Sequence, residues 1–174
     1  DLGVLLAHVL VKLTRGANLE ATTKKSTAVP TRLMQAIPDF SWKDMRVLEL
    51  GCGVGLTGLV AAALGAKVTL LTDLQDVVET VVKNNVDFNT LPGPNKICRY
   101  RTTRNGGRVV AMPLCWGNIE DEDNVVNGME RLTTKPTKRK QPKKGGTISN
   151  REGIPDLILI ADVAYQHKPG APSH

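Results

Sequence analysis

The stretch RVLELGCGVGLTG, residues 46–58, holds the residues most able to do chemistry. Gly51, Gly53 and Gly55 stand at alternate positions between a short apolar run and a helical pattern. Because glycine has no Cβ, such a turn lets the backbone bend sharply and lets a ligand approach it closely. The helix that follows offers unpaired N–H groups and a positive dipole end. The stretch therefore predicts a small-molecule site, with a plain strand-to-helix turn as the structural alternative.

Two classes of ligand use a turn of this kind, and two acids help to separate them. The dinucleotide pattern G-x-G-x-x-G begins at Gly53, and Asp73 follows it by 20 residues, the spacing of a ribose-binding acid. Glu49, however, stands two residues before Gly51 and gives the pattern E-x-G-x-G-x-G. An acid at this position suits the cationic sulfonium and α-amino group of S-adenosylmethionine, and it repels a pyrophosphate. We therefore favour S-adenosylmethionine over a dinucleotide.

The elements that must position these residues alternate between strands and helices. Short apolar runs predict strands at residues 46–50, 67–73, 108–116 and 156–161. Apolar residues at helical spacing predict helices at residues 2–13, 56–65 and 76–88. Strands that are apolar on both faces and alternate with helices form parallel sheets covered on both sides. The predicted fold class is therefore α/β, a doubly wound, mainly parallel sheet with helices on both faces.

Two further sites lie just beyond predicted strands. Trp116 ends the third strand, where a flat aromatic side chain can stack on an adenine base, although a tryptophan there is also common in a core. Asp162 and Tyr165 form a D-x-x-Y pattern after the fourth strand. A carboxylate and a phenol together can align an amine and help it to lose a proton. The structural alternative for Asp162 is a helix N-cap, which is compatible with that role.

The ordered set VLELGCGVG, TLLTDL, NN, WG and DLILIADVAY resembles methyltransferase family 16, the protein-lysine methyltransferases of the class I, seven-strand type. The resemblance implies a Rossmann-like fold, S-adenosylmethionine as the cofactor and a protein lysine side chain as the substrate. It also implies the role of each site residue. The glycine motif, with Glu49, Gly51, Cys52, Gly53 and Gly55, would hold the cofactor, Asp73 would bind its ribose, Trp116 and Ala161 would line its adenosine, and Asp162 and Tyr165 would face the lysine.

The pattern of the resembled family extends further than this sequence. A seven-strand domain has three more strands after the one at residues 156–161, and we expect them to be absent here. The fourth strand would then lie at an open edge of the sheet. A truncated chain that retains the fold without catalysis is therefore the alternative to an active enzyme.

Polar segments separate the elements of what we expect to be one domain over residues 1–174. Residues 14–44 are interpreted as a long connection and residues 118–153 as a polar insert. Within the insert, residues 131–151 hold eight basic residues and no acid, and so account for the net charge of +6. Lacking an apolar period, this segment is expected to be a disordered loop. A nucleic-acid methyltransferase that uses the basic loop is the alternative, but no aromatic residues are interleaved for base stacking.

The cysteines and the hydropathy of the sequence indicate the cellular compartment that we expect for this protein. Cys52, Cys98 and Cys115 form no C-x-x-C pair, so we expect neither a disulfide framework nor a metal site. Unpaired cysteines suit a reducing compartment, the cytoplasm and, with the basic segment, also the nucleus. No apolar run approaches the roughly 20 residues of a membrane span, so no membrane partner is expected.

Overall fold

The core of the molecule is one six-stranded sheet with the order β3-β4-β5-β2-β1-β6. The computed structural model describes residues 2–20, 41–94, 100–133 and 154–161. The strands are β1 (Arg46–Leu50), β2 (Val68–Asp73), β3 (Leu91–Pro92), β4 (Arg101–Thr102), β5 (Arg108–Pro113) and β6 (Leu157–Ile160). Strands β5, β2, β1 and β6 run parallel, whereas β3 and β4 pair antiparallel at one edge. The predicted α/β class with a mainly parallel sheet is confirmed.

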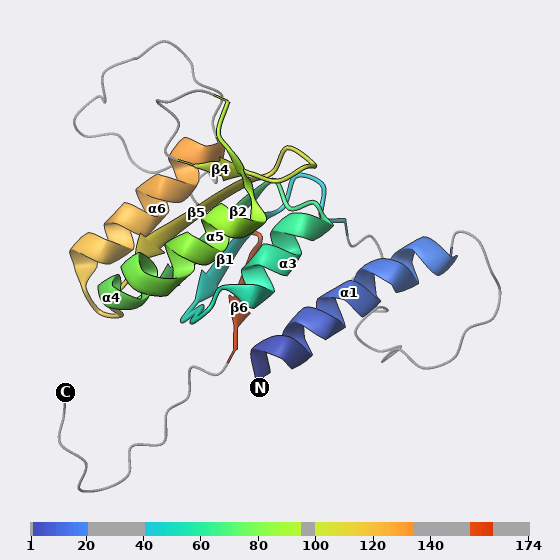
Figure 1. Ribbon diagram of the computed structural model, residues 1–174, viewed down its shortest axis with the longest axis horizontal. Coiled ribbons are helices and arrows are strands. Elements are labelled where there is room, and N and C mark those ends of the chain that lie inside the picture. The colour runs from blue at the N-terminus through green and yellow to red at the C-terminus, as the bar shows by residue number, and fades with distance from the viewer. Residues whose placement is uncertain (1, 21–40, 95–99, 134–153, 162–174) are drawn as a thin grey trace, which may run out of the picture.

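Helices cover both faces of this sheet (Figure 1). The helices are α1 (Leu2–Glu20), α3 (Leu56–Leu64), α4 (Gln75–Val77), the π-helical turn η1 (Val78–Val82), α5 (Lys83–Asn89) and α6 (Ile119–Thr133). Successive residues of a strand point to opposite faces, and β1 shows the consequence. Val47 packs in a buried cluster with Leu10 of α1, whereas Leu48 packs with Met129 of α6. The two faces are therefore covered by different helices, as the sequence predicted.

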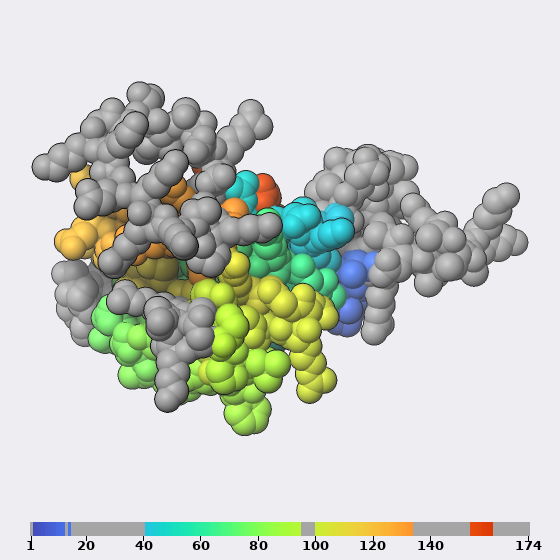
Figure 2. Space-filling model, turned by 90° about the horizontal axis from the view of Figure 1, so that it is seen from above, coloured from blue at the N-terminus to red at the C-terminus, as the bar shows by residue number. Residues whose placement is uncertain are grey.

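The central strand β2 is the most buried of the sheet. Its residues Val68 to Thr72 are buried, and only Asp73 at its carboxyl end is partly exposed. Figure 2 shows the elements from β1 to α6 packed into one continuous body, with α1, in blue, at its side. Five buried residues in a row leave the end of β2 as the place where a polar side chain of this strand can meet a ligand.

Several predicted boundaries are wrong; the strand predicted over residues 108–116, for example, ends at Pro113 as β5. The first helix was expected to end at residue 13, but α1 continues to Glu20, so the connection predicted over residues 14–44 begins later. Thr14 stabilises this extension, because its hydroxyl donates to the Leu10 carbonyl and accepts the indole N–H of Trp42 at 2.7 Å. The rest of that connection, residues 21–40, lies outside the described residues.

The predicted polar insert over residues 118–153 also needs correction. Its first part is the helix α6, which buries Val125, Met129 and Leu132 against the sheet. These residues have the spacing of one helical face, and the acidic run in the first turn obscured it in the sequence. Of the segment predicted as a basic disordered loop over residues 131–151, residues 131–133 belong to α6, and residues 134–151 lie outside the described part of the chain.

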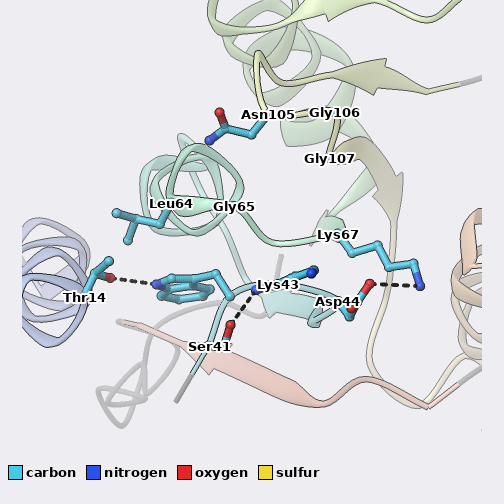
Figure 3. Close-up of a pocket in the computed structure, with 11 residues that line it drawn as sticks. Thr14, Ser41, Lys43, Asp44, Leu64, Gly65, Lys67, Asn105, Gly106 and Gly107 are labelled. Atoms are coloured by element: carbon cyan, nitrogen blue, oxygen red, sulfur yellow. Dashed lines mark hydrogen bonds and ion pairs between the residues drawn. The ribbon is translucent and has the colours of Figure 1, made fainter. Parts of the chain in front are cut away.

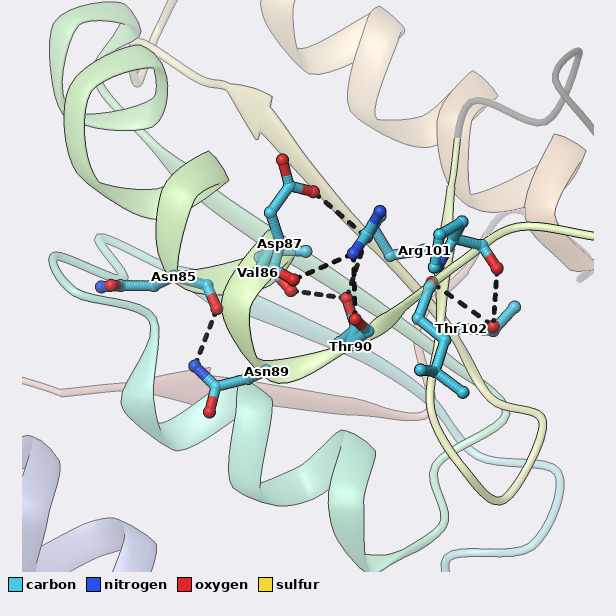
Figure 4. A network of polar contacts seen from close by, with 9 residues as sticks. Asn85, Val86, Asp87, Asn89, Thr90, Arg101 and Thr102 are labelled. Atoms are coloured by element: carbon cyan, nitrogen blue, oxygen red, sulfur yellow. Dashed lines mark hydrogen bonds and ion pairs between the residues drawn. The ribbon is translucent and has the colours of Figure 1, made fainter.

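The two short antiparallel strands were not predicted, and Arg101 fastens them to α5 (Figure 4). Its guanidinium donates to the backbone carbonyls of Asp87 and Thr90, both at 2.9 Å. It also pairs with the Asp87 carboxylate at 3.1 Å. At the other edge of the described sheet, β6 pairs with β1. Within the described residues, no helix is long and apolar enough to cross a membrane.

Candidate cofactor site

The glycine loop between β1 and α3 adopts a backbone that glycine alone adopts readily. Gly51, Gly53 and Gly55 have φ angles of 61°, 54° and 76°, in the left-handed region. The loop closes on itself through a hydrogen bond from the Gly55 N–H to the Cys52 carbonyl, 2.7 Å. A second bond, from the Cys52 N–H to the Thr72 carbonyl at 2.9 Å, fixes the start of the loop to β2. The three alternate glycines are therefore required by the conformation of the turn.

Glu49 lies behind this loop and contacts the first turn of α3. Its side chain is only 2% exposed, and its Oε2 accepts the N–H of Gly58 at 2.9 Å. The Thr57 hydroxyl also hydrogen-bonds to this carboxyl. Burial raises the pKa of the Glu49 carboxyl from 4.5 to about 7, and the nearby charge of Asp73 adds to the rise. The carboxyl therefore joins the end of β1 to the start of α3.

Asp73 lies on the open side of the same loop. One carboxylate oxygen accepts the N–H of Gly53 at 2.7 Å, and the other accepts the N–H of Leu74 at 2.8 Å. The side chain is partly exposed at the carboxyl end of β2. Two backbone donors thus set the orientation of this carboxylate. Each oxygen keeps a further lone pair with which it can accept another hydrogen bond.

Trp116 follows β5 at the same edge of the sheet and is 56% exposed. The end of β5 is held to β2 by a hydrogen bond from the Leu114 N–H to the Asp73 carbonyl, 2.8 Å. The turn around Trp116 is held by α6, because Asp121 accepts the N–H of Cys115 and Glu122 accepts the N–H of Gly117. Trp116 therefore lies exposed on a turn that is fixed by hydrogen bonds, and it is not buried in the core.

The carboxyl ends of the four parallel strands bring the described candidate residues to one edge. Leu50 at the end of β1 pairs with Thr72 of β2 and with Ile160 of β6, and Ala161 follows directly after Ile160. Beside Trp116, an apolar hollow of about 480 Å³ lies between the sheet and α6, with Leu50, Leu114 and Ile160 in its wall. Asp162 and Tyr165, predicted to face the lysine, lie outside the described residues.

The cysteines and acids form no metal site in the part of the chain described here. No group of three or more histidine, cysteine or acidic side chains in this part could hold a metal ion. Cys52 and Cys115 are free thiols, the first buried and the second exposed. Burial raises the pKa of the Cys52 thiol well above its ordinary value, so this cysteine within the glycine loop is a neutral packing residue. Cys98 lies outside the described residues.

A second hollow, of about 490 Å³, lies near the amino ends of β1 and β2, at the opposite end of these strands from the glycine loop (Figure 3). Its wall includes Lys43 and Asp44 before β1 and Lys67 before β2. Asp44 and Lys67 form an ion pair at 3.5 Å, and Trp42 is 5% exposed with its indole N–H bonded to Thr14. Ligands of open α/β sheets bind beyond the carboxyl ends of the strands, so this hollow is not the candidate cofactor site.

One residue that fastens the glycine loop was not predicted. The Asn85 side-chain amide donates to the Val54 carbonyl at 2.9 Å. The sequence shows the motif NN at residues 84–85, but its spacing does not indicate that the side chain of one of the two asparagines bonds to a different element. This contact joins α5 to a loop that lies 31 residues earlier in the chain.

A glycine loop after the first parallel strand, an acid after the second and crossover helices on both faces define a Rossmann-like fold of the methyltransferase type. The family described as lysine methyltransferase matches residues 20–130, more than half of the chain. The chain therefore belongs to the lysine methyltransferase family. The matched region ends within α6, before β6 and the D-x-x-Y pattern.

Individual relatives match a shorter region. The protein-lysine N-methyltransferase rrg1 of Schizosaccharomyces pombe is 37% identical over 87 residues, which cover 48% of this chain and 25% of that protein. The ribosomal protein L11 methyltransferase of Clostridium botulinum (strain Eklund 17B / Type B) is 31% identical over 84 residues, 48% of this chain and 26% of that protein. The corresponding protein of Ruminiclostridium cellulolyticum is 27% identical over 82 residues, 47% of this chain and 25% of that protein. The matched segments thus span about a quarter of each relative.

Proposed function

We propose that this chain binds S-adenosylmethionine at the glycine loop and serves in methyl transfer to a protein lysine side chain. The observation that carries the proposal is the paired placement of Glu49 and Asp73 around the loop. The first acid fixes the loop to α3 from behind, and the second lies on its open side with free lone pairs. Membership of the lysine methyltransferase family supports the same conclusion.

The residues at the carboxyl edge have the chemistry that this cofactor needs. Asp73 would accept hydrogen bonds from the two ribose hydroxyls through the lone pairs that Gly53 and Leu74 leave free. Trp116 offers an exposed aromatic face for the adenine, and Ala161 is small enough to let the adenosine lie close to β6. Gly51, Cys52, Gly53 and Gly55 would contact the methionine part through backbone groups, a role for which the missing or buried side chains leave room.

The transfer step needs a neutral amine. When bound, S-adenosylmethionine supplies an electrophilic methyl carbon, and displacement by the lysine nitrogen leaves S-adenosylhomocysteine as a neutral thioether. The lysine must first lose a proton, because its ammonium form has no free electron pair. In our proposal the Asp162 carboxylate aligns the ammonium and, with the Tyr165 hydroxyl, helps to remove that proton. Oriented placement of amine and methyl group supplies much of the rate.

The same geometry disfavours a dinucleotide. A pyrophosphate at this turn would bind to the free N–H groups in the first turn of α3. The Gly58 N–H already donates to Glu49, which leaves one donor fewer for an anion. Once ionised, the buried carboxylate would also repel the phosphates. We therefore expect NAD(H) not to compete for the site.

Calorimetric titration with S-adenosylhomocysteine tests the proposal. We expect the purified chain to bind with micromolar affinity and Asp73→Asn to weaken binding about 10- to 100-fold, because hydrogen bonds to a charged group are worth about 1.5–3 kcal/mol. Asp76→Asn is the matched control, since this exposed acid lies in the first turn of α4. Equal affinity of Asp73→Asn and the original chain would contradict the site, and a folded chain without binding would contradict the proposed function. Methylation of protein substrates is monitored by mass spectrometry. A chain that binds S-adenosylhomocysteine but methylates no lysine would favour the non-catalytic alternative.

A further inference from the structure

We propose that Asn85 is a positioning residue that holds the glycine loop in its cofactor-binding conformation, an inference that rests on the proposed function. Asn85 lies on α5 and is partly buried, and its side-chain amide donates to the Val54 carbonyl at 2.9 Å. Val54 stands between Gly53 and Gly55, the two left-handed glycines at the tip of the loop. The bond therefore acts on the part of the loop that has the most conformational freedom.

Hydrogen bonds other than that of Asn85 attach the tip of the loop to the sheet and, through the Gly55 carbonyl and the Leu59 N–H, to α3. Asp73 of the sheet accepts the N–H of Gly53. On the far side of Val54, the Gly55 N–H is bonded within the loop, to Cys52. The Val54 side chain is 57% exposed and gives the tip little packing. Asn85 thus adds a hydrogen bond between the tip of the loop and α5, a further element besides the sheet and α3.

The π-helical turn η1 brings this helix close to the loop. A Cβ placed on Gly55 would lie 3.5 Å from a methyl group of Val82, so the loop backbone packs directly on η1. Asn85 comes three residues after Val82 and hence lies on a neighbouring part of the same helical face. A π turn holds one more residue than an α turn, and such turns are frequent at functional sites. The π turn η1 and the hydrogen bond from Asn85 to Val54 therefore lie next to each other.

The neighbouring asparagines provide an internal comparison. Asn84 donates to the Thr80 carbonyl at 2.9 Å, and Asn89 donates to the Asn85 carbonyl at 2.8 Å. Both bonds stay within the helix, four residues back, and Figure 4 shows the second of them. Of these three amides, only that of Asn85 reaches another element of the structure. Asn84 is therefore a matched control that changes the same residue type one position away.

A loop that is already ordered binds a ligand better, because the entropy of ordering it has been spent during folding. Removing the Asn85 bond should weaken S-adenosylhomocysteine binding about 3- to 10-fold, the effect of one hydrogen bond. Asn85→Asp should be the more severe change, because it places a carboxylate oxygen against the Val54 carbonyl. Asn85→Gln retains the donor on a longer side chain and should recover part of the affinity.

The experiment compares Asn85→Ala, Asn85→Asp and Asn85→Gln with Asn84→Ala and Asn84→Asp. Calorimetry gives the affinity for S-adenosylhomocysteine, and hydrogen exchange gives the opening of residues 51–58 in the free protein. We expect weaker binding and faster exchange in this segment for Asn85→Ala and Asn85→Asp, with both Asn84 variants close to the original chain. Unchanged affinity of Asn85→Asp, or the same loss in Asn84→Asp, would overturn the inference.

The two proposals fail in different ways. If the original chain does not bind S-adenosylhomocysteine, the proposed function fails, whereas the exchange comparison still decides whether Asn85 holds the loop. Faster exchange of residues 51–58 in Asn85→Asp than in Asn84→Asp would then support the role of Asn85 in holding the loop, and equal exchange would refute it. If the original chain binds and the Asn85 variants bind equally well, the function stands and the role of Asn85 is refuted.

Discussion

Gly58→Ala should destabilise this protein, although alanine is the better helix former. Gly58 lies in the first turn of α3, which packs directly on the sheet. A Cβ at this position would lie 2.6 Å from the Glu49 carboxylate and closer still to a methyl group of Leu71. Leu71 is fully buried at the centre of the sheet, and Glu49 is 2% exposed, so neither neighbour can move into solvent. The methyl group must therefore push the helix away from the strands or displace the acid.

The expected magnitude follows from three contributions. Overpacking a rigid core costs about 1–3 kcal/mol. Loosening the bond between Glu49 and the Gly58 N–H costs about 1–3 kcal/mol more, because it leaves a buried donor unsatisfied. The helical preference of alanine over glycine returns at most about 1 kcal/mol. We expect a net loss of about 2–3 kcal/mol in the free energy of unfolding, since a partial shift relieves the clash and the bond together.

Urea denaturation followed by circular dichroism measures this loss, and Gly128→Ala is the control. Gly128 lies in α6, and a Cβ there would lie 2.7 Å from the sulfur of Met112. Methionine is flexible and only partly buried at this position, so it can shift, and we expect a change within about 0.5 kcal/mol. A Gly58→Ala protein as stable as the original chain, or no less stable than Gly128→Ala, would show that the contact between α3 and β2 can accommodate the added methyl group.

Two further predictions concern charged groups of the core and the sheet edge. Because the pKa of Glu49 is raised from 4.5 to about 7, folding favours its protonated form, and stability that is present below pH 4.5 is lost as the pH rises through 7, in total about 3 kcal/mol. Glu49→Gln should remove this dependence, so equal pH profiles of the two proteins in denaturation would contradict it. At the other position, the guanidinium of Arg46 on β1 holds the pKa of Asp156 below its usual range, which adds stability that is present at neutral pH and lost as the pH falls through the acidic range. Since Asp156 is partly exposed, Asp156→Asn should cost only about 1 kcal/mol, and hydrogen exchange should show the loss mainly in β6; unchanged exchange there would refute this.

Local sequence patterns predicted the parts of the fold that depend on local rules. The buried strands are short apolar runs, and the left-handed turn needs glycines, so both are visible without the structure. Helix α6 was missed because Val125, Met129 and Leu132 are spread among acids and asparagines, and only their contact with the sheet shows their importance. The strands β3 and β4 are two residues long, too short for an alternating pattern to develop.

The candidate site divides in the same way. The positions of Glu49 and Asp73 relative to the glycines are a matter of spacing, and the sequence alone placed both acids at the loop. Their partners depend on tertiary contacts, because Glu49 reaches forward to Gly58, whereas Asp73 reaches back 20 residues to Gly53. The contact of Asn85 with Val54 spans 31 residues and depends on how α5 packs on the loop. No periodicity within either segment encodes that packing.

The different surroundings of the two acids allow binding to be separated from folding. Glu49, which the resemblance assigns to the cofactor, is only 2% exposed, and its carboxyl bonds to the first turn of α3, so it offers little surface to a ligand. Substitution with glutamine keeps an acceptor for the Gly58 N–H and should change stability with pH while leaving affinity close to that of the original chain. Asp73 is partly exposed, so Asp73→Asn should lower affinity, and its loss of stability should be limited to the one backbone hydrogen bond that the amide nitrogen cannot accept. A Glu49→Gln protein that folds but loses S-adenosylhomocysteine would instead place the buried acid in contact with the cofactor, and the division of roles would be wrong.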